Sequence, residues 1–149
     1  MVEQVPVGQP VQMGADNPYP ALSQPASNPY ASAPGNYEAL LKEIIQKSPY
    51  NVYCVDCKKN QSTHCSFFFG VFICETCATT HKVEVGMDKS YVKAITDIFD
   101  EYQIKFLKSE HTGNFAFHEF MKEYKMEAWP IHKKYNCRPA KYYKKRLRF

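Results

Sequence analysis

The chain has 149 residues and a mass of 17.3 kDa, which is room for one domain and a tail rather than two full domains. Apolar residues make up 44% of it and charged residues 23%, and the net charge of +4 does not by itself imply nucleic-acid binding. No apolar run reaches the roughly 18 residues of a transmembrane helix. The first 41 residues contain no Lys or Arg, so we expect neither a secretory signal peptide nor a usual matrix transit peptide.

Residues 1–36 differ in composition from the rest of the chain. They hold seven of the ten prolines and only two charged residues, Glu3 and Asp16, whereas residues 37–149 hold all 19 basic residues and all six cysteines. We therefore predict a Pro/Gln/Asn-rich extended arm at 1–36 and a folded domain at 37–149. We interpret the two Asn-Pro-Tyr repeats in the arm as linker turns rather than peptide ligands. Segments of this kind often wrap a neighbouring surface, so we expect other protein subunits as partners of the arm.

The folded part is predicted to begin with a helix that Asn36 caps and that Pro49 ends. Apolar side chains recur there at helical spacing, at Leu40, Leu41, Ile44 and Ile45. Further along, the aromatic and β-branched run at 65–74 predicts two short strands that are broken at Gly70.

Two Cys-x-x-Cys pairs flank this run: Cys54 with Cys57, then Cys74 with Cys77. Pairs at this spacing predict one Zn²⁺ ion held by four thiolates, with no open position for a substrate, so we expect a structural zinc. Disulfides are disfavoured because no secretion signal accompanies the cysteines, and a thioredoxin-type site needs only one such pair. We interpret His81 as a packing or hydrogen-bonding residue rather than a fifth ligand.

Three further helices are predicted in the second half of the chain. Residues 91–107 fit either one helix or a turn followed by a helix. Asn114 is predicted to cap the next helix. The apolar face of that helix would consist of Phe115, Phe117, Phe120 and Met121. Pro139 suits the first turn of the last helix, which ends in the basic stretch 141–149. The remaining cysteines, Cys65 and Cys137, are expected to be small buried hydrophobes.

Residues from about 40 to 149 resemble the zinc-finger domain of the Arf GTPase-activating proteins, the ArfGAP family. Besides the cysteine spacing, the matching stretches are 70–74, 81–82, 90–93, 114–117 and 134–140. The resemblance implies an α+β fold, in which a small zinc-braced three-stranded sheet is surrounded by helices. It also implies an activity, which is to speed GTP hydrolysis by Arf-type small GTPases through an arginine supplied in trans.

That arginine corresponds to Lys82 in this chain. Lysine keeps the positive charge but loses the planar fork that binds two oxygens at once. Because arginine fingers contribute about 10³–10⁵ in rate, we expect most of the activity to be lost. Further departures lie at His64, where the family usually has Trp, at Lys93, where it has Arg, and in the loop 86–90, which lacks a histidine.

We therefore predict a degenerate, non-catalytic ArfGAP-like zinc module that serves as an accessory subunit of a larger assembly, with a mitochondrial respiratory complex as one host. The alternative is an active GTPase-activating protein for Arf-type small GTPases. The family favours a cytoplasmic location, with a mitochondrial inner-membrane complex as the alternative. A DNA-binding finger is disfavoured because the segment 54–77 between the outermost zinc-binding cysteines, which we call the zinc loop, has few positive charges. We interpret the basic tail as a solvated helix end that can also contact anionic lipid or an acidic neighbour.

Overall fold

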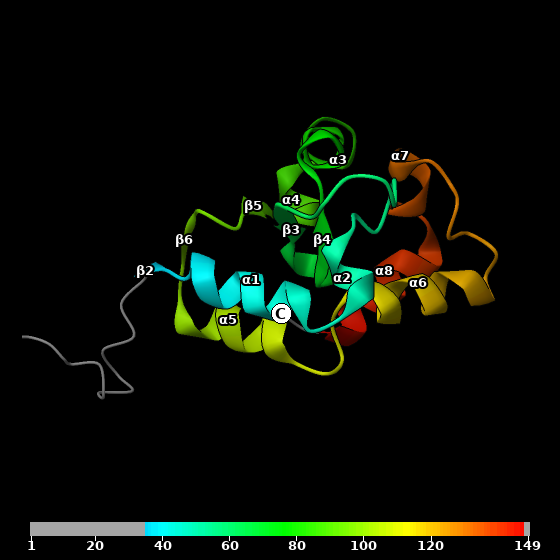
Figure 1. The fold of residues 1–149 in the computed structure, drawn as a ribbon. Coiled ribbons are helices and arrows are strands. Elements are labelled where there is room, and N and C mark those ends of the chain that lie inside the picture. Colours follow the sequence, from blue (N-terminus) through cyan, green and yellow to red (C-terminus); the bar gives the residue numbers. More distant parts are fainter. Residues whose placement is uncertain (1–34, 148–149) are drawn as a thin grey trace, which may run out of the picture. The chain divides into compact units, whose positions relative to one another are not determined.

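The computed structural model describes residues 35–147, which form an α+β domain (Figure 1). Its elements in chain order are β2 (Gly35–Asn36), α1 (Glu38–Gln46), α2 (Pro49–Val52), β3 (His64–Ser66), η3 (Phe67–Phe69), β4 (Val71–Ile73), α3 (Glu75–Thr80), η4 (His81–Val85), α4 (Met87–Ser90), β5 (Val92–Ala94), β6 (Ile98–Phe99), α5 (Glu101–Lys108), α6 (Asn114–Glu123), α7 (Ile131–Lys134) and α8 (Arg138–Leu147). Residues 1–34 of the predicted arm, with both Asn-Pro-Tyr repeats, lie outside the described residues. The boundary near Asn36 stays a prediction. None of the described helices has the length and apolar character that crossing a membrane requires.

The predicted three-stranded sheet is confirmed, in the order β4-β3-β5 with antiparallel pairs. Cys65 in the central strand lies opposite Phe72 on one side and Lys93 on the other. A second, two-stranded sheet joins β2 to β6 and attaches the first described residues to the domain.

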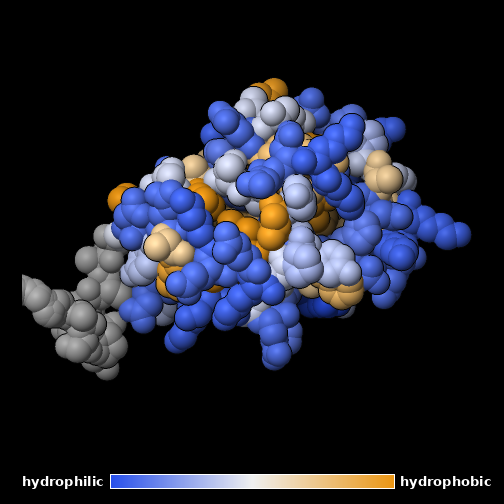
Figure 2. Space-filling model, viewed as in Figure 1, coloured by the Kyte–Doolittle hydropathy of each residue, from blue (hydrophilic) through white to orange (hydrophobic). Residues whose placement is uncertain are grey.

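Both faces of the larger sheet are covered by helices. Successive side chains of a strand point to opposite faces, and β4 divides accordingly. Val71 and Ile73 pack in a core cluster with α6 and α8, whereas Phe72 packs in a second cluster with α1 and α5. In Figure 1, α1 and α5 run along one side of the sheet and α6 and α8 lie together at the other end. Figure 2 shows apolar atoms over β3 and β4, with a largely hydrophilic surface around them.

The predicted break between the two strands is confirmed at Gly70. The short helix η3 precedes it, and Gly70 takes the left-handed conformation with φ +60°. A Cβ atom at this position would lie 2.9 Å from Thr112 Cγ2, so both the backbone angle and the space favour glycine.

The helix starts differ in detail from the sequence-based expectations. The first helix begins one residue later than predicted, so Tyr37 and not Asn36 occupies the cap position. Asn36 still contributes its side chain, because its Oδ1 accepts a hydrogen bond from the Glu38 N–H, 2.9 Å away. Pro49 does not follow α1 directly but opens α2, which Ser48 caps. Proline suits that first turn because its missing N–H would have no partner inside the helix.

Within residues 91–107, the single-helix alternative is wrong and the turn followed by a helix is closer. Two strands, β5 and β6, precede α5. The side chain of Asp97 accepts from the Ala94 N–H and holds the intervening turn. Asp100 and Gln103 then form a reciprocal capping box that starts α5.

Two expectations for α6 are wrong. Gly113, at φ +114°, is the cap residue, and Asn114 lies inside the helix with its side chain buried. Asn114 Oδ1 accepts from the Phe72 N–H, and Nδ2 donates to backbone carbonyls of the zinc loop region, so it ties α6 to β4. Phe115 is 47% exposed and packs against the tilted ring of Tyr50, with ring centres 4.6 Å apart, instead of facing the core.

Candidate functional site

The structure brings the four predicted metal-binding thiols together. The sulfur atoms of Cys54, Cys57, Cys74 and Cys77 all lie within 4.8 Å of one another. The first pair lies in the turn after α2, and the second pair spans the end of β4 and the first turn of α3. All six cysteines of the chain are free thiols, so the disulfide alternative finds no support.

The spacing of the sulfur atoms suits a tetrahedral ion. Zinc–sulfur bonds of about 2.3 Å at tetrahedral angles place two sulfur atoms about 3.8 Å apart. The Cys57 and Cys74 sulfur atoms are 3.8 Å apart. The cluster can therefore hold one zinc ion, and four thiolates around it leave no position for a substrate.

Hydrogen bonds already favour negative charge on these sulfur atoms. Backbone N–H groups of Asp56 and Lys59 donate to Cys54 Sγ and Cys57 Sγ over 3.4 and 3.5 Å. The hydrogen bond from the Cys77 thiol lowers the pKa of Cys54 to about 5, and the same contact raises the pKa of Cys77. A proton shared in this way is displaced when a cation takes its place.

Asp56, inside the first Cys-x-x-Cys turn, anchors a buried polar network. Its Oδ1 atom is 2.7 Å from both Lys134 Nζ and Tyr135 Oη, and its Oδ2 atom is 2.8 Å from His81 Nε2. Burial alone would raise the pKa of Asp56, but the hydrogen bond from His81 and the charge of Lys134 outweigh it and lower that pKa to about 2. Asp56 is therefore an anion that ties the zinc loop to η4 and α7.

His81 is confirmed as a hydrogen-bonding residue rather than a metal ligand. It is fully buried, and its second ring nitrogen, Nδ1, lies 2.8 Å from Ser90 Oγ. Ser90 Oγ is in turn 2.6 Å from Ser66 Oγ in β3. Although Asp56, His81 and Ser90 have the residue types of a hydrolytic triad, the serine is fully buried and no substrate reaches it. The arrangement is structural.

Lys82 follows His81 directly but differs from it in burial. It lies in η4, a π-helix, and its side chain is exposed. Single π-turns inside helices often occur at functional sites, because they turn one residue outward from the helical register. The neighbouring apolar side chains are also open to solvent: Val83 is 77% and Met87 is 45% exposed.

Two of the further departures from the family pattern, His64 and Lys93, differ in their surroundings. Burial and the nearby charge of Lys82 lower the pKa of His64, so these two positions lie close enough to interact. Lys93 instead stabilises the fold. Its ammonium group donates a hydrogen bond to the Ile98 carbonyl and lies 4.4 Å from the centre of the Phe99 ring. The charge of Lys93 therefore braces β5 against β6.

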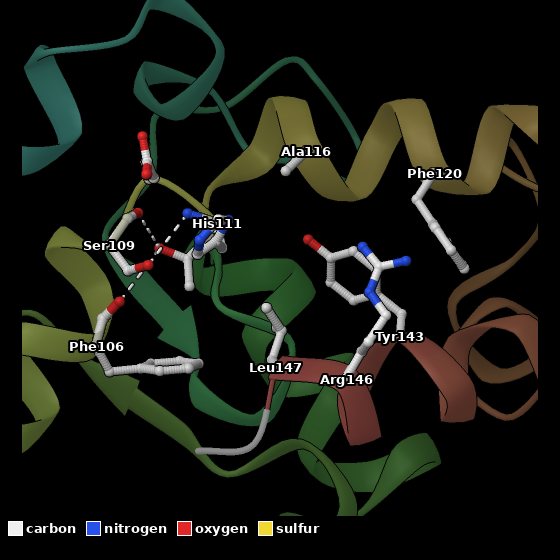
Figure 3. Close-up of a pocket in the computed structure, with 10 residues that line it drawn as sticks. Phe106, Ser109, His111, Ala116, Phe120, Tyr143, Arg146 and Leu147 are labelled. Atoms are coloured by element: carbon white, nitrogen blue, oxygen red, sulfur yellow. Dashed lines mark hydrogen bonds between the residues drawn. The ribbon is translucent and has the colours of Figure 1, made fainter.

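A cavity of about 560 Å³ lies between α6, α8 and the loop that follows α5 (Figure 3). Ala116 and Phe120 line it from α6, and Tyr143, Arg146 and Leu147 line it from α8. None of its lining residues is a site residue predicted from the sequence.

The sequence did not lead us to expect Asp56, Lys134 and Tyr135 in a buried polar network beside the four cysteines. Asp56 gave a signal, since it is an acidic residue in a turn that also carries two metal-binding thiols. Lys134 and Tyr135 fall in the stretch 134–140 that matches the family, but nothing in their spacing relates them to a loop almost 80 residues earlier.

Comparisons with known proteins agree with this geometry. The family model ArfGap, described as "Putative GTPase activating protein for Arf", matches residues 38–148. The chain is 33% identical over 115 residues to Sporulation protein SPS18 of Saccharomyces cerevisiae, covering 75% of this chain and 37% of the relative. It is 35% identical over 79 residues to "Probable ADP-ribosylation factor GTPase-activating protein AGD15" of Arabidopsis thaliana, covering 52% and 33%. This chain spans between 12% and 37% of the length of such curated relatives.

A solved structure shares the fold. It is described as "putative GTPase activating protein for ADP ribosylation factor from Cryptosporidium parvum", with a TM-score of 0.63 and 24% identity. The superposition covers 74% of this chain and 90% of that one.

Proposed function

Because the chain belongs to the ArfGap family, we propose that it binds an Arf-type small GTPase and increases the rate at which that GTPase hydrolyses GTP. The observation that carries this proposal is the position of Lys82. It is exposed at the start of η4, and the residue before it is held by hydrogen bonds at both ring nitrogens. The backbone that presents the lysine is thus fixed while its ammonium group is free to approach a partner.

The surface around Lys82 supports an interface with another protein. Val83 and Met87 expose large apolar side chains beside it, and such side chains become favourable contacts when a partner covers them. In the proposed complex, the Lys82 ammonium group approaches the oxygens of the transferred phosphoryl group and stabilises the negative charge that develops there.

We expect the acceleration to be weaker than an arginine would provide. An arginine finger contributes about 10³–10⁵ in rate, in part because its planar fork binds two oxygens together. A lysine places one compact charge at the same site. Zinc takes no part in this step. We infer that Cys54, Cys57, Cys74 and Cys77 are its ligands and that it holds α3, which continues directly into η4 with His81 and Lys82.

A second candidate is a non-catalytic interaction module, and the substitutions at Lys82 and His64 favour it. In that case the zinc domain binds its partner without accelerating hydrolysis, and residues 1–36 attach it to other subunits of an assembly. A mitochondrial respiratory complex is one host for such an accessory subunit, whereas a cytoplasmic location suits the GTPase activator.

Single-turnover GTP hydrolysis separates these candidates. The zinc-loaded full chain is mixed with a GTP-loaded Arf-type GTPase, and phosphate release is followed for wild type, Lys82→Arg and Lys82→Ala. We expect acceleration by wild type, at least about tenfold more by Lys82→Arg, and none by Lys82→Ala. Lys105→Ala, which removes an exposed lysine on α5, serves as the matched control and should behave as wild type. Rates equal to that of the GTPase alone for every variant would exclude activity on that GTPase, and retained binding would then favour the non-catalytic module.

A further inference from the structure

The charges of the described residues are unevenly distributed along the chain. Residues 35–121 contain nine Lys and Arg against eleven Asp and Glu, whereas residues 122–147 contain nine against two. The net charges of these two stretches are therefore −2 and +7 with histidine neutral. The second stretch also exposes its charge: seven of its basic side chains are solvent-exposed, but only one of its acidic side chains, Glu123, is.

Helix α8 gathers much of this charge on one stripe. Its exposed positions are Arg138, Lys141, Tyr142, Lys145 and Arg146, which follow the i, i+3, i+4, i+7, i+8 spacing of a single helix face. The opposite side of α8 is anchored in the core by Ala140 and Tyr143, both nearly fully buried. The helix is therefore fixed with four cations and one tyrosine facing outward.

Aromatic side chains of α6 and of the residue that follows it extend this stripe. Phe120 stacks on Tyr142 with ring centres 6.3 Å apart and also contacts Tyr124 at 5.3 Å. Tyr142 is 57% and Tyr124 is 47% exposed. We call the stripe on α8 together with Phe120 and Tyr124 the basic face. Figure 1 shows α6 and α8 close together at one end of the domain, and their ring contacts agree with this.

We propose that the basic face binds the surface of an anionic lipid bilayer. Lysine and arginine are attracted to acidic headgroups, while tyrosine rings place an apolar body and a polar tip at the boundary between lipid and water. No helix among residues 35–147 is long and apolar enough to span the bilayer, so this contact is peripheral.

Nucleic acid is the other polyanion that basic and aromatic residues recognise, but the ring geometry disfavours it. Binding of single strands relies on open ring faces on which bases stack. Here the guanidinium group of Arg146 lies over the rings of Phe120 and Tyr142, at 5.4 and 5.9 Å, and these two rings stack on each other. One face of each ring is therefore turned toward the other ring, which leaves fewer open faces on which bases could stack.

Vesicle co-sedimentation of the zinc-loaded full chain tests the proposal. The probes are vesicles of phosphatidylcholine alone and of phosphatidylcholine with about one-third phosphatidylserine. We expect the wild type to bind the anionic vesicles at least about tenfold more tightly than the neutral ones. Raising the salt from about 0.1 M to about 1 M shortens the screening length from about 10 Å to about 3 Å and should release the protein.

A pair of charge reversals locates the contact. Each lysine close to an anionic surface contributes about fivefold in affinity, so Lys141→Glu with Lys145→Glu should weaken binding by about 25-fold or more. The matched control is Lys47→Glu with Lys105→Glu, which makes the same change of net charge at exposed positions directly after α1 and on α5, and it should weaken binding far less. The salt dependence of the wild type remains informative if the first pair misfolds.

Three results would overturn the proposal. Equal binding to neutral and anionic vesicles would show that charge plays no part. Equal weakening by the two pairs would show that net charge matters and the basic face does not. Binding to a single-stranded oligonucleotide without binding to anionic vesicles would assign the face to nucleic acid.

Discussion

Replacing Asp56 with asparagine removes one negative charge from the interior while keeping the shape of the side chain. In the wild type this carboxylate lies 2.7 Å from the ammonium group of Lys134, and both side chains are 3% exposed. Water therefore cannot take the place of the lost charge. Breaking a buried ion pair by removing one partner costs about 3–5 kcal/mol, a large part of the about 5–15 kcal/mol by which a domain is stable.

The pKa of Asp56 gives a second measure of the same contribution. It is lowered from the ordinary value of 3.8 to about 2, which corresponds to about 2 kcal/mol of stability at neutral pH. Because the pKa in the folded state lies below that in the unfolded state, this stabilisation is complete above about pH 4 and is lost as the pH falls toward about 2.

Urea unfolding of the zinc-loaded protein tests this reasoning in a cycle of Asp56→Asn, Lys134→Met and the double variant. The single Asp56→Asn change should lower the free energy of unfolding by about 3 kcal/mol or more, and adding Lys134→Met should restore at least about 1 kcal/mol, because no buried ammonium group is left unpaired. The difference in unfolding free energy between wild type and Asp56→Asn should also narrow between about pH 4 and about pH 2. A loss below about 1 kcal/mol, or strictly additive effects, would refute the role of the ion pair.

Two further predictions concern the metal and the core. Chelation of zinc, or Cys74→Ser, should abolish the cooperative thermal unfolding transition, since structural zinc contributes about 10–16 kcal/mol of apparent binding energy; an unchanged melting curve would contradict this. Phe117→Ala, at a position 1% exposed, should lower the free energy of unfolding in urea by about 3–5 kcal/mol, whereas Phe115→Ala, on the same helix and 47% exposed, should cost less than half as much; equal losses would argue against the packing described here.

Much of the architecture could be predicted from local patterns in the sequence. The cysteine spacing indicated a four-thiolate cluster because each Cys-x-x-Cys turn presents its two sulfur atoms to one point. Gly70 marked the break between two strands because few other residues take that backbone conformation, and Pro139 lies in the first turn of α8 as expected.

Other parts could not be predicted, because contacts distant in sequence decided them. The apolar pattern of residues 91–107 fits a helix, but pairing with β3 and β2 draws Val92–Ala94 and Ile98–Phe99 into strands. Asn114 has the side chain of a helix cap, yet bonds to Phe72 and to carbonyls more than 60 residues earlier take it into the interior. The charge partner of Asp56, Lys134, is equally distant in sequence, so no local pattern predicts that the two side chains are buried together.

The contacts of Asp56 with Lys134 and Tyr135 also bear on how the chain folds during its synthesis. During synthesis the two cysteine turns leave the ribosome well before residues 134 and 135 do, and the aspartate between Cys54 and Cys57 then has no cation to face. A contact between residues this far apart in sequence forms late, because the intervening chain loses conformational entropy before the contact contributes any stability. The nascent zinc loop should therefore load metal early but only loosely, and become resistant to exchange and proteolysis when α7 docks on it.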